Sequence, residues 1–152
     1  MSYDRDSLAT QLRHREGNCR HAYRDSVGTF TIGIGHNLER PIPQEAVDLI
    51  YEADVAVAEQ DLDSIVLNWR SLDNVRQQAL VHLSFALGGL RLRKFKRMLA
   101  AIAGNDWPRA SAELLDSEWA RVVGDEPGQR ADEVAQMLHD GGFMWPPSEN
   151  GG

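Results

Sequence analysis

The chain has 152 residues, of which 42% are hydrophobic and 26% are charged, and its formal net charge at pH 7 is −7. These values are typical of one globular domain, and the acidic balance argues against nucleic acid as a partner, because domains that bind nucleic acid present basic surfaces. No apolar run approaches the roughly 18–20 residues of a membrane span, and residues 1–16 lack the apolar centre of a signal peptide. We therefore expect synthesis into a cytoplasm, without a signal peptide or a transmembrane segment.

The first predicted elements are a helix and a β-hairpin. Residues 6–16 have apolar side chains at helical spacing and are followed by a glycine, which is a good C-terminal cap. From residue 23 to residue 38 the period changes to two, with turn chemistry at residues 25–28. The second strand of this hairpin carries Thr31 and is expected to expose its backbone through the two glycines that follow.

The rest of the chain is predicted to be helical. Pro41 and Pro43 break the chain, and the periodicity after them predicts a long amphipathic helix that begins near Pro43. The apolar residues 75–87 predict a helix that runs through the core. Asp106 and Ser117 are placed to cap further helices. The remaining helices are expected at residues 93–103, 107–115, 117–119 and 128–142.

The predicted fold is therefore α+β and mainly helical. We expect a small lobe at about residues 17–60 with a hairpin or small sheet, and a helical lobe at about residues 1–16 and 61–145. The long helix joins the two lobes within one domain. The residues 146–152 are expected to form a flexible tail.

Three residues of the N-terminal part suggest glycosidase chemistry. Glu16 ends the first helix, Asp25 opens the hairpin turn, and Thr31 lies on the second strand. Glycoside hydrolysis uses two carboxyl groups, one protonated and one ionised. Partial burial would keep Glu16 protonated, whereas Asp25 lies among turn amides and solvent and would be ionised. Taken singly, each residue is better explained as an ordinary surface, turn or strand residue.

The combination resembles the catalytic stretch of the phage-type lysozymes, the endolysins of glycoside hydrolase family 24. The similar residues are Glu16-Gly17, Tyr23-Arg24-Asp25 and the run TIGIGH from Thr31. The resemblance implies a lysozyme-like two-lobed fold and a muramidase. It implies that Glu16 is the general acid, that Asp25 and Thr31 position and activate the attacking water, and that the anomeric configuration is inverted.

The resemblance also implies further roles. The substrate-binding residues would be Gly35, Asn37, Phe85 and Glu113. His36 is expected to be structural and to pair with an acid on the following helix, where Asp54 matches by position. No cofactor is expected, and no metal either, because the remaining histidines have no ligand spacing. The lone Cys19 excludes an intramolecular disulfide.

The implied substrate is the glycan strand of peptidoglycan, cut at the β-1,4 bond between N-acetylmuramic acid and N-acetylglucosamine to lyse bacterial cells at the end of a phage cycle. A monomer is expected, held in the host cytoplasm until a holin-type membrane protein releases it to the periplasm and cell wall. The alternatives are a lytic transglycosylase, a tail-associated lysozyme and a non-catalytic glycan-binding module. The basic run RLRKFKR, residues 91–97, is either a patch that attracts the enzyme to an anionic wall or an ordinary solvated helix face.

Overall fold

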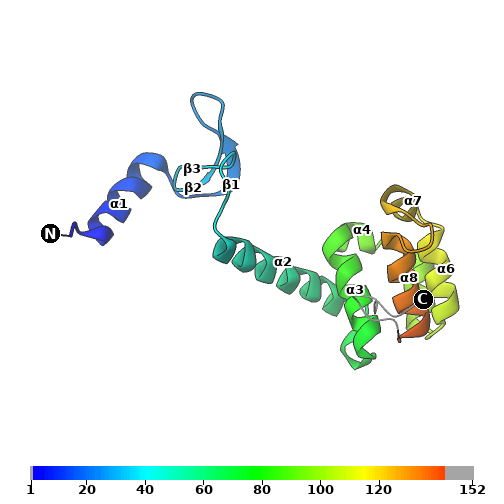
Figure 1. Cartoon of the computed structure of the whole chain (residues 1–152). Helices are drawn as coiled ribbons and strands as arrows, with labels where there is room; N and C mark the ends of the chain where they lie inside the picture. The colour runs from blue at the N-terminus through cyan, green and yellow to red at the C-terminus, as the bar shows by residue number, and fades with distance from the viewer. Residues whose placement is uncertain (1, 143–152) are drawn as a thin grey trace, which may run out of the picture. The chain divides into compact units, whose positions relative to one another are not determined.

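A computed structural model describes residues 2–142 and has a mainly helical α+β fold, as the sequence predicted (Figure 1). Two compact units make up the chain, Met1–Leu49 and Ile50–Gly152, and the boundary between them falls within the long helix. The predicted lobe boundaries, which place residues 1–16 with the helical lobe, stay a prediction. The predicted flexible tail, residues 146–152, lies outside the described residues.

The N-terminal unit begins with helix α1, Arg5–Glu16. The side chain of Asp4 accepts hydrogen bonds from the amides of Asp6 and Ser7, which satisfies donors that the first helical turn leaves free. Gly17 ends the helix at a φ of 87°, a conformation that favours glycine. The predicted extent of this helix is confirmed.

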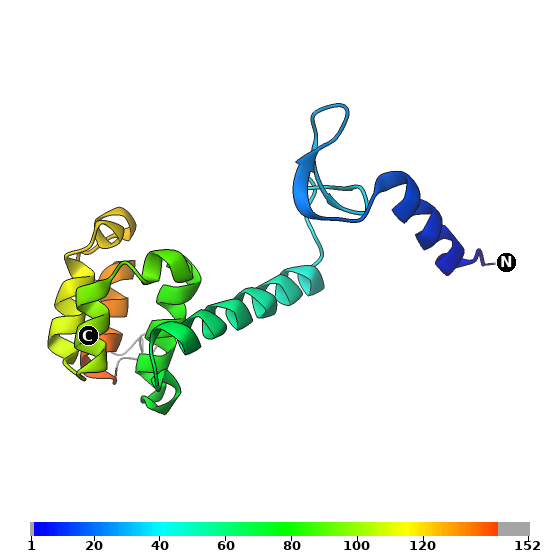
Figure 2. The same ribbon diagram turned by 180° about the vertical axis from the view of Figure 1, so that it is seen from behind.

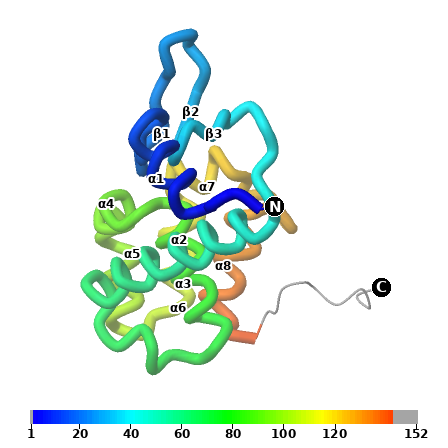
Figure 3. Tube along the Cα trace, turned by 90° about the vertical axis from the view of Figure 1, so that its left-hand side faces the viewer, coloured from blue at the N-terminus to red at the C-terminus, as the bar shows by residue number. Residues whose placement is uncertain are grey.

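Three antiparallel strands follow in the order β1-β2-β3: β1 Cys19–Arg24, β2 Phe30–Gly33 and β3 His36–Asn37. The β1–β2 turn extends away from the sheet, as the rear view in Figure 2 and the trace in Figure 3 show. The second strand was expected to continue through both glycines, but it ends at Gly33, and residues 36–37 form a third strand. The chain turns at Ile34-Gly35, because Gly33 and Gly35 have positive φ values of 68° and 69°, which extended strands do not accommodate.

Helix α2, Gln44–Ile65, begins directly after Pro43, as predicted. It continues into a short 3₁₀ helix, η1, Trp69–Ser71, that the sequence analysis missed. The other helices of the C-terminal unit are α3 Asn74–Leu87, α4 Gly89–Leu92, α5 Lys96–Ala103, α6 Trp107–Leu115, α7 Glu118–Val123 and α8 Arg130–Asp140.

The hydrophobic core of the C-terminal unit is built around α3, which packs against α8, while α6 packs against both α5 and α8 (Figure 1). The leucines at the centre have no exposed surface and come from four helices, two of them from α3: Leu62, Leu80, Leu83, Leu114 and Leu138. The prediction that α3 runs through the core is therefore confirmed. The one buried polar side chain of α3 is Ser84, and its hydroxyl is satisfied because it donates a hydrogen bond to the carbonyl of Ala58 at 2.8 Å.

Side-chain caps fix the starts of α3, α6 and α7 in this unit. Asp106 accepts from the amide of Arg109, and Ser117 accepts from the amide of Ala120, as the sequence predicted. The helix expected at residues 93–103 begins only at Lys96, and the basic run 91–97 spans the end of α4 and the start of α5. Among residues 2–142, no helix is long and apolar enough to cross a membrane.

Candidate functional site

Glu16 and the β2–β3 turn meet within the N-terminal unit. Glu16 is the last residue of α1, its side chain is exposed, and its carbonyl accepts a hydrogen bond from the Tyr23 hydroxyl at 3.3 Å. A Cβ atom placed on Gly35 would lie 3.1 Å from Glu16 Oε2 and 3.2 Å from Glu16 Cβ. The turn can therefore approach the carboxylate closely because residue 35 has no side chain.

The carboxylate of Asp25 is fixed by its own turn. Oδ1 accepts from the amide of Thr29 at 2.8 Å and from the amide of Val27 at 3.0 Å, and the Asp25 amide donates to the Thr29 carbonyl. These bonds hold a half-buried carboxylate in one orientation. Because both amides bind Oδ1, Oδ2 remains available to a water molecule.

Thr31 lies on the central strand and is the one buried side chain among the described residues of the N-terminal unit, 4% exposed. Its hydroxyl donates to the carbonyl of Thr29 at 3.0 Å. The hydrogen is thus committed to the protein, and the oxygen lone pairs are left to accept a hydrogen bond, for example from water. Both Thr31 and Asp25 are therefore tied to Thr29.

The other predicted residues of this unit flank the same strands. Asn37 is the β3 partner of Thr31, and its Oδ1 accepts from the amide of Glu39 at 2.8 Å. His36 is the β3 partner of Ile32, and its buried Nε2 has no hydrogen-bond partner among residues 2–142. The pairing of His36 with Asp54 stays a prediction.

Phe85, Glu113 and Asp54 belong to the C-terminal unit. Phe85 is 45% exposed, and its ring centroid lies 6.4 Å from that of Tyr51. Glu113 Oε1 lies 4.0 Å from Arg109 Nε on the same face of α6. Their roles in substrate binding, like those of Gly35 and Asn37, stay predictions.

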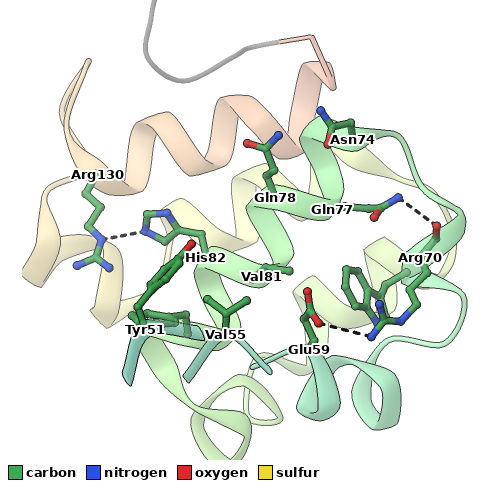
Figure 4. A pocket seen from close by; sticks show the side chains of 12 residues that line it. Tyr51, Val55, Glu59, Arg70, Asn74, Gln77, Gln78, Val81, His82 and Arg130 are labelled. Carbon is green, nitrogen blue, oxygen red and sulfur yellow. Dashed lines mark hydrogen bonds and ion pairs between the residues drawn. The ribbon is translucent and has the colours of Figure 1, made fainter. Parts of the chain in front are cut away.

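The C-terminal unit also contains a pocket of about 590 Å³ that the sequence analysis missed (Figure 4). It lies between α2, α3 and η1, with Arg130 of α8 at its edge. Arg130 Nε donates to His82 Nε2 at 3.0 Å, so the neutral imidazole carries its proton on Nδ1. Burial, and secondarily the Arg130 charge, lowers the pKa of His82. The two residues are 48 positions apart, and no local motif signals their contact.

Neither unit shows a metal centre within residues 2–142, where no three His, Cys, Asp or Glu side chains are grouped to hold an ion. The three candidate catalytic residues of the N-terminal unit supply an exposed carboxyl, Glu16, a hydrogen-bonded carboxyl, Asp25, and a buried hydroxyl, Thr31. This is a set suited to proton transfer and to the activation of water.

Comparisons with known proteins identify the family. The phage lysozyme family model matches residues 13–132. The chain is 24% identical to probable T4-type lysozyme 1 of Dictyostelium discoideum, over 89% of this chain and 95% of that protein. It is 27% identical to probable T4-type lysozyme 2 of the same organism, over 74% and 84%.

A third relative is the pre-baseplate central spike protein Gp5 of Enterobacteria phage T4, which is 28% identical over 74% of this chain but only 25% of its own length. The family match covers the candidate residues of the N-terminal unit and most of the helical unit. The chain therefore belongs to the phage lysozyme family and is a peptidoglycan hydrolase, a glycoside hydrolase of the lysozyme type.

Proposed function

We propose that the protein cleaves the β-1,4 bond between N-acetylmuramic acid and N-acetylglucosamine with inversion. Glu16 is the general acid that protonates the glycosidic oxygen, and Asp25 is the base that takes a proton from the attacking water. Thr31 orients that water. The observation that carries the proposal is that Asp25 and Thr31 both hydrogen-bond to Thr29, because these bonds orient the carboxylate and the hydroxyl and leave Oδ2 of Asp25 and a lone pair of the Thr31 oxygen available to water.

We expect Glu16 to act as the acid and Asp25 as the base because the surroundings of the two carboxyl groups differ. Asp25 receives two amide hydrogen bonds, which hold its carboxylate in the fixed orientation that a base acting on a bound water requires. The residues of the N-terminal unit leave Glu16 exposed, and we propose that the bound glycan covers its side chain. Inversion requires a water molecule between carboxylate and sugar, which is the role given to the Asp25–Thr31 pair.

The test compares Glu16→Gln with Glu39→Gln, an exposed glutamate of the same unit whose side chain makes no hydrogen bond among the described residues. General acid catalysis contributes about 10²–10⁴-fold, so Glu16→Gln should lose at least 10²-fold in the turbidity decrease of permeabilised Gram-negative cells. Glu39→Gln should keep parental activity. A folded Glu16→Gln enzyme with near-parental activity would show that Glu16 is not the proton donor.

Two further variants and a product analysis test the water-activating pair. Asp25→Asn should be severely impaired, and Thr31→Ala less so, with Thr31→Ser restoring part of the activity because it keeps the hydroxyl. Mass spectrometry should find reducing muramic acid ends, whereas 1,6-anhydro ends would identify a lytic transglycosylase instead. The anomer first released, followed by NMR, should have the configuration opposite to that of the substrate.

In its biological setting, we propose that the enzyme acts as a monomer and lyses the host at the end of a phage cycle. A holin-type membrane protein would release it from the cytoplasm to the periplasm and cell wall. The similarity to the phage central spike protein favours a second candidate, a tail-associated lysozyme. Detection of the protein in purified virions would select the second candidate, and its restriction to the infected cell would select the first.

A further inference from the structure

The cations of this acidic chain are unevenly distributed. Five of its 16 lysines and arginines lie within seven residues, and both lysines of the sequence are among them. We call residues 90–97 the basic segment; its cations are Arg91, Arg93, Lys94, Lys96 and Arg97. The net charge of the whole chain is nevertheless −7, so the remaining surface is strongly acidic.

The start of the basic segment is held firmly on α2. Asp61 Oδ2 accepts from the amide of Gly89 at 3.1 Å, and Arg93 donates to the hydroxyl of Ser64 at 2.8 Å. Leu92 is completely buried and anchors the turn in the core. The segment therefore presents its side chains from a fixed backbone.

The backbone geometry sets which side chains point outward. The α4 turn continues past its end, because Arg93 has helical dihedral angles and the amide of Lys94 bonds to the carbonyl of Arg91 at 3.0 Å. Positions 90 and 94 are one helical turn apart and share a face. That face lies opposite the buried Leu92, so Leu90 projects from the surface together with Lys94.

The leucine and the four cations other than Arg93 make no side-chain hydrogen bond within residues 2–142. Leu90 is 82% exposed, and all five cations are exposed. Within the described part of the chain, none of the five forms an ion pair. Glu113 and Asp116 line a shallow hollow beside Lys94 and Arg97, but they lie beyond ion-pair distance.

A segment of exposed cations that begins with an exposed leucine is complementary to one kind of surface. Anionic lipid headgroups attract clustered lysines and arginines, and an apolar side chain can enter the boundary between headgroups and acyl chains. The peptide carboxylates of a cell wall would pair with the cations but offer no site for the leucine. We propose that the basic segment binds the protein to membranes that contain anionic phospholipid, with Leu90 inserted.

The negative charge of the rest of the chain helps to orient the basic segment toward the membrane. A surface of negative charge is repelled by a negative membrane, whereas the basic segment is attracted, so the electrostatic field turns this segment toward the lipid. The attraction acts over about 10 Å at 0.1 M salt. Binding is therefore expected to weaken as ionic strength rises.

The experiment is sedimentation of the full-length chain with vesicles of phosphatidylcholine alone or of phosphatidylcholine mixed with phosphatidylglycerol. The protein should bind the mixed vesicles and not the neutral ones. The triple variant Arg91→Gln, Lys94→Gln, Lys96→Gln should bind the mixed vesicles about tenfold or more weakly. Leu90→Ser should also bind more weakly, and its residual binding should be more sensitive to salt.

The matched control neutralises three exposed arginines elsewhere, Arg5→Gln, Arg40→Gln and Arg121→Gln, with the same change in net charge. This control should bind as the parent does, and thermal melting should show all variants to be folded. Equal loss in the control, no binding to mixed vesicles, or charge-dependent binding to purified peptidoglycan sacculi alone would overturn the proposal. Parental binding by Leu90→Ser would overturn the insertion of the leucine. Because no readout involves glycan cleavage, these results are independent of the catalytic assignment.

Discussion

Gly35 combines two constraints that no other residue type satisfies together. Its φ of 69° is one that side-chain-bearing residues rarely adopt, and its Cα faces the carboxylate of Glu16. Gly28 shares the first constraint, with a φ of 87°, but has no atom within 4 Å of where a Cβ would be. The two glycines thus separate the cost of backbone strain from the cost of contact with Glu16.

We therefore predict different outcomes for Gly35→Ala and Gly28→Ala. Both variants should lose about 1 kcal/mol or more of unfolding free energy, because alanine is strained at positive φ. Gly35→Ala should lose more activity per folded molecule than Gly28→Ala, since its methyl group would displace Glu16. Denaturant unfolding and lysis assays on both purified variants measure the two effects. Equal activity of the two folded variants would mean that the contact does not position Glu16.

At the scale of elements, a carboxylate of α2 joins that helix to η1. Asp63 Oδ1 accepts from Trp69 Nε1 at 2.8 Å and from Arg70 Nε at 2.9 Å, and Oδ2 accepts from the other arm of the guanidinium at 3.1 Å. The hydrogen bond from Arg70, then that from Trp69, lowers the pKa of Asp63 below its ordinary value of 3.8. The folded protein therefore favours the ionised form of Asp63.

The sign of the pH effect follows from this direction. A carboxylate with a depressed pKa in the folded state stabilises the protein above its unfolded pKa, and the contribution is lost as pH falls through the folded pKa. We predict that Asp63→Asn melts at a lower temperature than the parent near neutral pH, and that the difference shrinks below pH 3.8. Asp125→Asn, an exposed loop aspartate, is the control and should melt as the parent does at every pH. A difference between parent and Asp63→Asn that is constant with pH would contradict the prediction.

The same elements show what the sequence could predict. Gly17, Asp106 and Ser117 are local signals, and the helix ends they predicted are confirmed. The η1 corner depends on a bond between residues seven positions apart, and α4 depends on Asp61, which lies 28 positions before Gly89. Local helix propensity cannot predict hydrogen bonds between residues so far apart in the sequence. The spacing of Asp25 and Thr31 could be recognised in the sequence. Their shared hydrogen bonding to Thr29 and the contact of Gly35 with Glu16 could be seen only in the folded structure.

At the scale of the whole molecule, buried surface is concentrated in one of the two units. Among residues 2–49 only Thr31 is buried, whereas the C-terminal unit contains the complete core cluster. A small three-stranded sheet without a buried apolar face contributes little stability of its own. Opening of the strands should therefore require less free energy than opening of α3 or α8.

We predict that amide hydrogens of β1 and β2 exchange faster than those of α3 and α8 at neutral pH. Hydrogen–deuterium exchange followed by mass spectrometry measures both sets in one sample. Leu83→Ala in the core of α3, which should cost about 2–5 kcal/mol, is expected to accelerate exchange in α3 and α8 together. Protection of β1 and β2 equal to that of α3 would show that the strands open only with the entire molecule.

The restriction of lysine to positions 94 and 96 has a consequence for labelling chemistry. Reagents that acylate amines, including common dyes, biotin esters and amine-coupling sensor surfaces, have only these two exposed side chains and the α-amino group as targets. Each acylation removes a positive charge from residues 90–97 and covers that surface with the attached group. A preparation labelled or immobilised in this way would carry its modification on the segment assigned to lipid. The lone, half-buried thiol of Cys19 on β1 offers an attachment site in the other unit.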